Sequence, residues 1–570
     1  MYKGLREYIK VLESQNELIK IKEFVDPVYE IAEITDRISK QPGGGKALLF
    51  ENTGTTFPVL TNMMGSNKRI CSALGIDSFQ EIGLQMENLI QELTQERSSF
   101  IEKLKLLPQL KEASKWLPSR YRHTPPCQEV VLFQPNLDRF PILKCWPQDG
   151  GRFITLPLVH TKDPKTGARN LGMYRMQVFS KGSTGMHWHR HKTGARHFAA
   201  CTEGQFPVAI SLGGDPVYTY AATAPLPDGI DEYLLAGFLR DKPVQLSDCL
   251  TQPLQVPADS DIVIEGYINK NDPYVLEGPF GDHTGFYSLA DLYPKLNITC
   301  ITHRKDAVYP ATLVGIPPQE DKYIAIATEK IFLTPIKFAM VPEILDMHLP
   351  EEGCGHNLAF IKIDKSYPGQ AIKVAHALWG AGQMMFNKIM VITNEDIDIR
   401  DYSQIFDTIS RNYNPRTDTH FSRGPSDVLD HAAPALGYGG KVMFDATIKF
   451  PEESGSKNQP ESNDSMLALN FTDNPKDLKG KINIITDSNI TGQYLSLWTW
   501  GSNCDPIRDS YFTGNQLVMD ATTKSSGEGI REWPQIAISS METIQRVDDK
   551  WHSLGIGIFI ESPSLHFHRK

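Results

Sequence analysis

A glycine-rich stretch in the middle of the chain holds two carboxylates close together. In VLEGPFGDHTGFYS, residues 275–288, Glu277 and Asp282 stand five positions apart among glycines, a proline, a histidine and aromatic residues. The stretch is too rich in glycine for a helix and too polar for ordinary core, which predicts a turn. Either a reaction needs two acids in this turn, or both acids only cap it.

Histidines gather in a second unusual stretch, STGMHWHRHKTGARH, residues 183–197. If residues 187–191 form a strand, His187, His189 and His191 point to one face, because side chains alternate along a strand. One or more of them could then bind a metal ion. The alternative is that these histidines are hydrogen-bonded or solvated on the wall of a barrel.

Further candidate ligands flank the histidines. NLGMYRMQV carries Asn170 and Arg175, and PLPDGIDEYLLAG carries Glu232. A carboxylate, an imidazole and an amide oxygen form a mixed nitrogen and oxygen set. Such a set suits a hard or borderline divalent ion such as Mn²⁺ or Mg²⁺ that bridges to a phosphate, and it suits a thiolate-binding metal poorly.

The pattern of the whole chain predicts three domains that position these residues. Residues 1–115 predict an α/β lobe, which includes a long amphipathic helix over residues 78–107. Residues 130–315 contain short β-branched or aromatic runs between Gly and Pro turns, which predict a β-rich barrel or sandwich. Residues 325–570 alternate helical and strand signals and predict an α/β domain. The expected fold class is therefore mixed, α+β.

Charge and hydropathy exclude several functions. The 570 residues include 58 Lys and Arg against 68 Asp and Glu, so the formal net charge is -10 and the pI about 5.9. This balance argues against a nucleic acid or an anionic membrane surface as the main partner. The N-terminus lacks the apolar region of a signal peptide, and no stretch has the roughly 18 apolar residues of a membrane span. We therefore expect a cytoplasmic protein with no integral membrane segment. Its eight scattered cysteines contain no CxxC pair, which indicates reduced thiols.

The C-terminal part repeats a pattern of its own. Two aspartates mark each copy of the pattern, 27 residues apart in the first copy and 11 in the second. These similar segments predict a degenerate duplication, and the alternative is a chance likeness of short motifs. The matching segments are residues 391–418 and 441–450 in the first copy, and 484–509 and 517–526 in the second, with Asp418, Asp445, Asp509 and Asp520 as the aspartates.

Four of these segments, in this order, resemble a known family. NLGMYR, HWHRHKTGA, PLPDGIDEYLLAG and EGPFGDHTGFYS are similar to the signature segments of the UbiD family, the prenylated-FMN-dependent decarboxylases that include 3-polyprenyl-4-hydroxybenzoate decarboxylase. Further matches, such as VDPVYEIAEITDRI and DVLDHAAPALGYGGKVMFDATIKF, extend the resemblance over nearly the whole chain. The resemblance implies an N-terminal α/β lobe, a central split β-barrel that binds the flavin, and a C-terminal α/β domain that serves in oligomerisation.

The resemblance also implies roles for individual positions. In the family an Asn, a His and a Glu hold a divalent metal, usually Mn²⁺, against the cofactor phosphate, and the matching positions are Asn170, His191 and Glu232. The family's catalytic triad of an Arg, a Glu and a second acid maps onto Arg175, Glu277 and Asp282. Contacts with the flavin, its phosphate and its ribityl tail fall on Met173, Tyr174, Arg175, His187, Trp188, His189, Arg190, Lys192 and Lys441.

The implied reaction is a reversible, non-oxidative decarboxylation of an aromatic or α,β-unsaturated carboxylic acid. Loss of CO₂ from such an acid leaves a carbanion that cannot delocalise, and because no side chain is an electron sink, a cofactor must take the electrons. In the family, a covalent adduct with prenylated FMN does so, and a proton then replaces CO₂. Asp282 is the expected donor, with a pKa raised by burial beside apolar walls, while Glu277 pairs with Arg175.

The same resemblance suggests a substrate, cofactors and partners. The EGPFGDHTG form of the motif favours a (polyprenyl) hydroxybenzoate or a related intermediate of ubiquinone or menaquinone biosynthesis. The implied cofactors are prenylated FMN and Mn²⁺ or Mg²⁺, with K⁺ as a further candidate. The implied partners are a second copy of the chain in a homo-oligomer and a flavin prenyltransferase that supplies the cofactor. A prenylated substrate would add peripheral membrane contact.

Some positions depart from the family pattern. His187 stands where the ubiquinone branch has an Arg, and Lys192-Thr193-Gly194 stands where it has Gly-Gly, so the phosphate contacts are expected to differ. An insert near residues 452–528 adds 75 residues (520 minus 445) between the two DAT motifs, and its polar residues 452–465 predict an exposed loop.

Two other function classes fit parts of the sequence. A metal-dependent hydrolase or oxygenase could use His187, His189 and His191 on one strand face, and it predicts bound zinc or iron without flavin. A non-catalytic flavin-binding protein would keep the cofactor pocket without turnover, although the presence of Arg175, Glu277 and Asp282 argues against it.

Overall fold

The computed structural model describes residues 2–94, 114–189, 191–226, 229–453, 466–525, 527 and 529–569. The chain forms two compact units. The first contains Met1–Glu81, Thr94–Ile324 and Ile536–Arg569, and the second contains Ile82–Leu93 and Ala325–Gln535.

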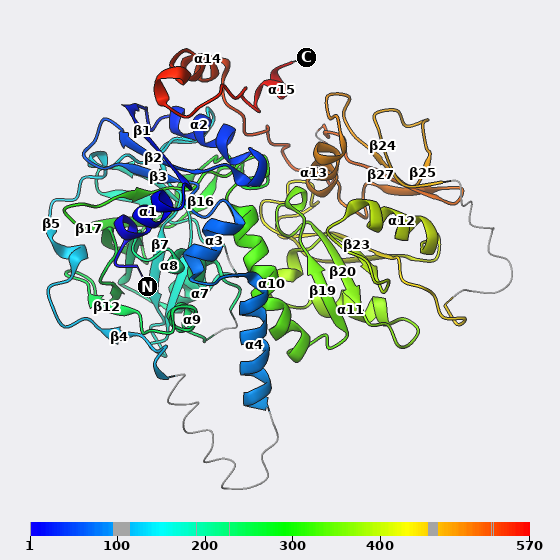
Figure 1. The fold of residues 1–570 in the computed structure, drawn as a ribbon, viewed down its shortest axis with the longest axis horizontal. Helices are drawn as coiled ribbons and strands as arrows, with labels where there is room; N and C mark the ends of the chain where they lie inside the picture. The colour runs from blue at the N-terminus through cyan, green and yellow to red at the C-terminus, as the bar shows by residue number, and fades with distance from the viewer. Residues whose placement is uncertain are drawn as a thin grey trace, which may run out of the picture. The chain divides into compact units, whose positions relative to one another are not determined.

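The first unit begins with an α/β lobe (Figure 1). Its sheet has the order β1-β2-β3-β18, with β1 parallel to β2 and β3 antiparallel to β2. In the first helix Leu5, Tyr8, Ile9 and Leu12 are buried at three- and four-residue spacing, so they line one face. The elements are α1 (Leu5–Ser14), β1 (Leu18–Phe24), α2 (Glu30–Ser39), η1 (Pro42–Gly44), β2 (Ala47–Asn52), β3 (Val59–Thr61), α3 (Asn67–Leu74) and β18 (Tyr309–Pro310).

A large antiparallel sheet forms the centre of the first unit and curls into a half-barrel. Its strand order is β6-β9-β10-β17-β14-β11-β7-β8, and β5 pairs with β17. Ile210 and Ile264 face each other on β11 and β14 and are buried, as expected for β-branched runs inside a curled sheet. The strands are β5 (Val130–Leu132), β6 (Phe153–Ile154), β7 (Leu158–Lys162), β8 (Arg169–Met173), β9 (Met176–Ser180), β10 (Ser183–Gly185), β11 (Gln205–Leu212), β14 (Ile262–Asn269) and β17 (Lys295–His303).

Shorter elements complete this region. A small sheet has the order β13-β12-β4, and β15 and β16 form a separate two-stranded pair. Three helices belong to the same region, and the last of them begins at Glu232 after Asp231, whose side chain accepts a hydrogen bond from the backbone N–H of Tyr233. The elements are β4 (Ser119–Arg120), η2 (Pro126–Gln128), η3 (Leu137–Arg139), α7 (Thr193–Ala200), α8 (Val217–Thr223), α9 (Glu232–Arg240), β12 (Gln245–Asp248), β13 (Gln255–Pro257), β15 (Val275–Glu277) and β16 (Asp291–Tyr293).

The end of the chain returns to the first unit. It contains α14 (Met541–Lys550), η6 (Trp551–Leu554) and α15 (Leu565–His568). Figure 1 shows α14, in red, beside the blue α2. The buried guanidinium of Arg37 on α2 forms an ion pair with Asp548 on α14, with 2.7 Å between Nη1 and Oδ1.

The second unit contains two sheets. A five-stranded sheet has the order β19-β20-β21-β23-β22, and a four-stranded sheet has the order β24-β25-β27-β26. Most of α4 (Phe79–Thr94) and of α10 (Asp321–Ala339) also belongs to this unit. The other elements are β19 (Ile344–His348), η4 (Glu351–Gly353), β20 (Leu358–Ile363), α11 (Gln370–Trp379), η5 (Gly382–Phe386), β21 (Ile389–Thr393), α12 (Tyr402–Asn412), β22 (Thr419–Pro425), β23 (Tyr438–Asp445), β24 (Leu467–Thr472), β25 (Gly480–Ile485), α13 (Gln493–Asn503), β26 (Ser510–Thr513) and β27 (Gln516–Asp520).

The structure confirms the mixed fold class and the β-rich middle of the chain. α4 covers the first part of the helix predicted over residues 78–107, whose residues 95–107 lie outside the described part, as do residues 454–465 of the predicted polar loop. The boundaries of the three predicted domains stay predictions.

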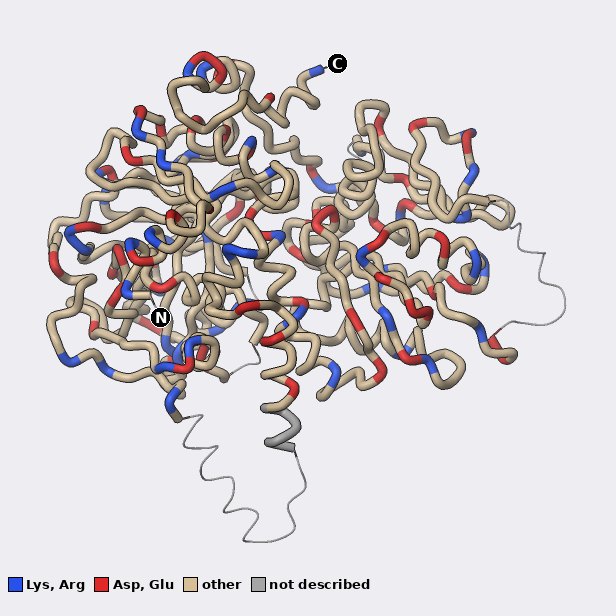
Figure 2. The backbone as a smooth tube through the Cα atoms, viewed as in Figure 1, with Lys and Arg blue, Asp and Glu red and all other residues tan. Residues whose placement is uncertain are grey.

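Three properties of the chain as a whole follow from the described residues. No helix among them is long and apolar enough to cross a membrane. All eight cysteines are free thiols. Figure 2 shows Lys and Arg interspersed with Asp and Glu along the backbone of each unit.

Candidate active site

An arginine lies between the two carboxylates that the sequence singles out. Arg175 follows β8, and its Nε is 3.0 Å from Oε1 of Glu277 while its Nη2 is 3.2 Å from Oε2 of the same side chain. Its Nη1 forms an ion pair with Oδ2 of Asp282, and its Nη2 donates to Oγ of Ser288 at 3.0 Å. All three charged side chains are at most 12% exposed. The structure thus brings together the three residues expected to form the triad.

The turn that carries the acids is held by hydrogen bonds from neighbouring strands and loops. The backbone N–H of Gly278 donates to Oε1 of Gln177 at 2.8 Å, and that of Gly281 donates to Oδ1 of Asp149 at 2.8 Å. Gly278 has a φ of +95°, which favours glycine, and a Cβ on Gly281 would lie 2.2 Å from Cδ1 of Trp146. The glycines therefore allow the turn to lie close against the rest of the unit.

The charge of Arg175 decides the protonation of both acids. Burial by itself raises the pKa of Glu277, but the nearby guanidinium of Arg175 outweighs it and lowers that pKa to about 2. Burial also raises the pKa of Asp282, and Arg175 again outweighs it and holds the pKa below its usual value. The expectation of a raised pKa for Asp282 is therefore wrong for this state of the protein, because the charge of Arg175 outweighs the effect of burial.

Two histidines continue the hydrogen-bonded chain beyond Glu277. Nδ1 of His187 is 2.8 Å from Oε2 of Glu277, and Nε2 of His187 is 2.8 Å from Nε2 of His189. Burial and the positive charge of Arg175 lower the pKa of His187, so its ring is neutral. Since ionised Glu277 can only accept, Nδ1 of His187 carries the hydrogen, and its bare Nε2 accepts from Nε2–H of His189.

The predicted strand over residues 187–191 is not present in the described residues. β10 ends at Gly185, and residues 186–189 lie outside any strand. The backbone N–H of Trp188 donates to the carbonyl of Met186 at 3.1 Å, which turns the chain away from the sheet, and the indole packs near Phe198. His187 and His189 face each other here, whereas His191 is exposed on the turn before α7.

Aromatic and small residues surround the end of β8. Tyr174 and Trp188 are buried with their rings edge to face, and their centroids are 6.2 Å apart. Gly194 at the start of α7 packs against both rings, and its N–H donates to the Tyr174 hydroxyl at 3.4 Å. Met173 is the last residue of β8 and is partly buried. These side chains form a wall that, by the family resemblance, is expected to contact a flavin.

Two of the three predicted metal ligands lie next to each other. The backbone N–H of Leu171, which follows Asn170, donates to Oε2 of Glu232 at 2.9 Å. Burial raises the pKa of Glu232 to about 7, because no cationic side chain in the described part of the chain pairs with it; the nearby Arg169 pairs with Asp231 instead. A partly buried carboxylate that has no cationic partner among the described residues, beside an amide, fits a divalent ion.

The remaining predicted ligands and cofactor contacts are distributed as follows. Among the described residues no group of three or more His, Cys, Asp or Glu side chains could hold a metal, and His191 belongs to no such group. The backbone N–H of Lys192 donates to the carbonyl of His189 at 3.0 Å. Lys441 belongs to the second unit, where its Nζ donates to the carbonyls of Met385 and Asn387. Arg190 lies outside the described residues.

Family models match most of the chain. The N-terminal, Rift-related and C-terminal domain models of 3-octaprenyl-4-hydroxybenzoate carboxy-lyase match residues 9–86, 119–317 and 322–446. An uncharacterized protein of Aquifex aeolicus is 47% identical over 463 residues, which are 81% of this chain and 95% of the relative. A protein of Helicobacter pylori is 35% identical and is matched over 96% of both chains. The chain belongs to the UbiD family. Family members are carboxy-lyases, and so is this protein.

Solved structures of UbiD-class enzymes have the same fold. Vanillic acid decarboxylase of Sedimentibacter hydroxybenzoicus in its closed form superimposes with a TM-score of 0.70 at 27% identity, over 81% of this chain and 95% of that chain. The UbiD-class enzyme HmfF of Pelotomaculum thermopropionicum, in complex with FMN, has a TM-score of 0.66 at 25% identity, over 81% and 98%. An evolved dimeric form of HmfF in complex with prFMN shows the same fold at 24% identity.

Sequence reasoning missed several residues of this UbiD-family site. Ser288 and His283 contact the triad directly, because Ser288 accepts from Arg175 and Nδ1 of His283 is 3.0 Å from Oδ1 of Asp282. Both belong to the acid-bearing motif, and only this position in the motif could have indicated that they contact the triad. Gln177 and Asp149, which hold the turn, have no such signal, because their role depends on which strands and loops meet in space.

Proposed function

We propose that this UbiD-family protein catalyses the reversible, non-oxidative decarboxylation of an aromatic or α,β-unsaturated carboxylic acid with prenylated FMN as cofactor. The observation that carries the proposal is the buried set of Arg175, Glu277 and Asp282. It combines one cation with two acids at the end of a β-strand whose other residues line the expected flavin wall. Prenylated FMN, when bound, supplies the electron sink that no side chain provides.

The acids of the site are suited to deliver one proton to the substrate carbon. Glu277 remains ionised and neutralises Arg175, so Asp282 can gain or lose a proton without leaving a buried charge unpaired. A substrate carboxylate adds a negative charge near Asp282, and a like charge raises the pKa of a carboxyl group. Substrate binding therefore moves the pKa of Asp282 upward and promotes its protonation at the point where a donor is needed.

The residues at the end of β8 are suited to hold the cofactor and its metal. Asn170, Glu232 and His191 would bind Mn²⁺ or Mg²⁺ at the cofactor phosphate, and the carboxylate of Glu232, which has no cationic partner among the described residues, supports this assignment. Tyr174 and Trp188 would exclude water from one side of the flavin. His187 and His189 hold Glu277 in its ionised, Arg-paired form.

Within this class we favour a hydroxybenzoate or a related quinone-biosynthesis intermediate as substrate. The EGPFGDHTG form of the acid-bearing turn supports this choice, since it resembles the quinone-precursor branch more than the acrylic-acid branch. A deletion strain that still makes normal amounts of quinone would contradict it.

The first experiment is anaerobic purification from cells that co-express a flavin prenyltransferase. We expect a flavin absorbance spectrum, the mass of prenylated FMN in the released cofactor, and about one Mn²⁺ per chain. A screen of hydroxybenzoates and related acids for CO₂ release then identifies the substrate. Bound zinc or iron without flavin would overturn the proposal.

A further inference from the structure

The two sheets of the second unit repeat one arrangement of strands. In the first sheet β20, β21 and β23 run parallel and β22 pairs antiparallel with β23; in the second sheet β24, β25 and β27 run parallel and β26 pairs antiparallel with β27. The register also agrees, because Ile392 pairs with Asp445 and Ile485 pairs with Asp520. A helix lies between the second strand and the antiparallel strand in each case, α12 in one and α13 in the other.

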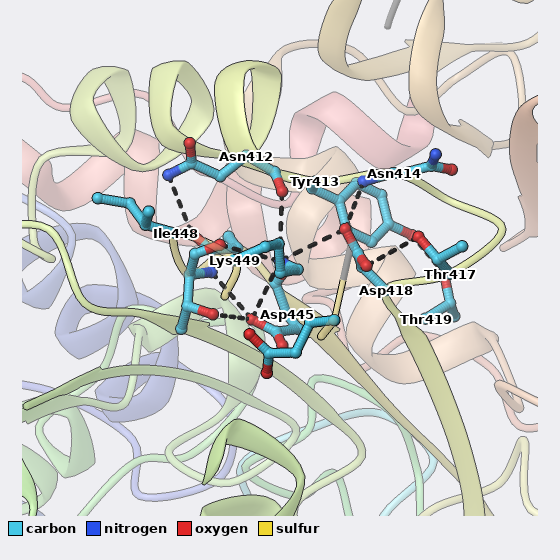
Figure 3. A network of polar contacts seen from close by, with 12 residues as sticks. Asn412, Tyr413, Asn414, Thr417, Asp418, Thr419, Asp445, Ile448 and Lys449 are labelled. Carbon is cyan, nitrogen blue, oxygen red and sulfur yellow. Dashed lines mark hydrogen bonds and ion pairs between the residues drawn. The ribbon is translucent and has the colours of Figure 1, made fainter. Parts of the chain in front are cut away.

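A polar network closes the first arrangement, as Figure 3 shows. The backbone N–H of Asp445 donates to the carbonyl of Asp418 at 2.9 Å, and the N–H of Asn414 donates to Oδ2 of Asp418 at 2.8 Å. Oδ1 of Asp445 accepts from the N–H of Thr447 at 2.9 Å and lies 3.3 Å from Nζ of Lys449. Lys449 also donates to the carbonyl of Thr447 at 2.9 Å.

The second arrangement has the same network at matching positions. The N–H of Asp520 donates to the carbonyl of Asp509 at 2.9 Å, and the N–H of Asp505 donates to Oδ2 of Asp509 at 2.7 Å. Oδ1 of Asp520 accepts from the N–H of Thr522 at 2.9 Å and lies 3.2 Å from Nζ of Lys524. Lys524 donates to the carbonyl of Thr522 at 2.7 Å. So many coincident bonds favour a duplication over a chance likeness of short motifs.

The two copies contact each other reciprocally. Phe421 and Phe512, which occupy matching positions on β22 and β26, face each other with ring centroids 6.4 Å apart. Nζ of Lys481 in the second copy donates to the carbonyl of Tyr413 in the first at 2.8 Å. The matching lysine of the first copy, Lys388, forms an ion pair with Asp430, and it lies close enough to Cys504, which matches Tyr413, to offset part of the rise that burial causes in the pKa of that thiol. The equivalent residues Phe421 and Phe512 contact each other, and a lysine of each copy lies near the matching loop of the other. This is the pattern of a twofold axis.

Apolar side chains from both copies fill the space between them. Phe444 of the first copy stacks on Trp500 of the second with ring centroids 6.1 Å apart. Val442 and Phe444 on β23 and Leu517 and Met519 on β27 are fully buried in one common core. Each copy therefore covers an apolar face that the other would expose if it stood alone.

We propose that residues 467–524 are an internal second copy of the module at 358–449, packed on it about a local twofold axis, and that this copy acts as a built-in partner for a self-complementary face. The partner that this face fits is thus a second copy of the same module. The C-terminal family model ends at residue 446, at the end of the first copy, so the second copy lies beyond it. The proposal does not depend on the cofactor or on the substrate.

Removal of the second copy tests the proposal directly. Deletion of residues 448–522 joins Thr447 to Thr523 and leaves Lys524 four positions after Asp445, where Lys449 stands in the intact chain. We expect this deletion variant to form particles with twice as many chains as the intact protein, measured by light scattering after gel filtration, because two exposed faces now meet. Adding Phe421→Arg to the deletion puts charges at the axis and is expected to restore the chain number of the intact protein.

Two results would overturn the proposal. One is a folded deletion variant, by circular dichroism, with the same number of chains as the intact protein. The other is a deletion variant whose chain number does not change when Phe421→Arg is added.

If the deletion variant is insoluble, the contact between Phe421 and Phe512 can be tested in the intact chain instead. Phe421→Glu and Phe512→Lys are each expected to lower the thermal unfolding temperature, and the double variant is expected to recover most of the loss, because the two new charges meet at the axis. Additive losses in the double variant would overturn the contact on which the twofold axis rests.

Discussion

At the scale of single residues, the site holds two acids around one cation, and this imbalance explains how the protein can keep a proton donor. Arg175 lowers the pKa of Asp282 below its usual value, so the free enzyme holds Asp282 ionised. In the proposed reaction Asp282 takes up a proton from solvent when the substrate binds, because the substrate carboxylate raises that pKa. The two carboxylates thus differ in role, since Glu277 has a second partner in His187 and stays ionised.

Replacement of the proposed donor tests its role. In Asp282→Asn the side chain keeps its size but cannot donate an acidic proton, so we expect kcat to fall by about 10²- to 10⁴-fold. Flavin content, measured by absorbance, is expected to stay unchanged. A variant that keeps full decarboxylation with flavin bound would show that another group is the donor.

The pH dependence of turnover tests the interplay of the two acids. The proposed reaction needs protonated Asp282, so we expect kcat to be lost as the pH rises through the pKa of Asp282 in the substrate complex. In Glu277→Gln the guanidinium of Arg175 is left to Asp282 alone, which lowers that pKa further, and the loss of kcat is expected to move to lower pH. Glu277→Asp, which keeps the charge, serves as the control. An unchanged pH profile in Glu277→Gln would contradict the coupling.

Residue types and motifs in the sequence predicted the three residues of the triad, but they did not predict the direction in which the pKa of Asp282 shifts. Arg175 and Asp282 are 107 positions apart, and the direction of the Asp282 pKa follows only from the short distance between them. The same holds for Asp149, whose carboxylate receives the Gly281 N–H across 132 positions. Such pairings depend on tertiary contacts, which no local pattern encodes.

At the scale of elements, periodic segments were predictable and irregular ones were not. Strands such as β11 and β14 follow from continuous runs of β-branched residues, and α1 follows from apolar residues at three- and four-residue spacing. The histidine stretch has the alternation of a strand, but its described residues after Gly185 pair with no strand, and the indole of Trp188 is buried. Alternation alone therefore placed His191 with His187 and His189 wrongly.

The acid-bearing turn is an element that tolerates no added side chain at one point. In Gly281→Ala the new Cβ would lie 2.2 Å from Cδ1 of Trp146, so the turn or the indole has to shift. We expect a loss of about 1–3 kcal/mol in the free energy of unfolding, measured by chemical denaturation, and a fall in kcat because Asp282 moves with its neighbour. Gly182→Ala is the matched control, since its nearest neighbour would be 3.8 Å away. Equal behaviour of the two variants would show that the turn adapts freely.

At the scale of the whole molecule, the end of the chain supports both the fold and the site of the first unit. The backbone N–H of Ala537 donates to the carbonyl of Gly285 at 2.9 Å, and Ile536 forms a bridge with Phe286, so the returning segment borders the acid-bearing turn. Farther along, α14 supplies Asp548 to the buried Arg37. The acid-bearing turn is therefore shaped by three distant parts of the sequence, around Asp149, Gln177 and Ala537.

One substitution at Asp548 tests how far the first unit depends on the returning end of the chain. In Asp548→Asn the guanidinium of Arg37 keeps Glu33, 2.6 Å from its Nε, but loses a charged partner in a buried setting. We expect the free energy of unfolding to fall by about 1–3 kcal/mol, less than for a fully buried pair, because the side chain of Asp548 is 28% exposed. Asp549→Asn changes an exposed neighbour on the same helix and should leave stability within about 0.5 kcal/mol of the wild type. If both variants unfold alike, α14 is not anchored through Arg37, and the packing of the returning segment must rest on its apolar contacts alone.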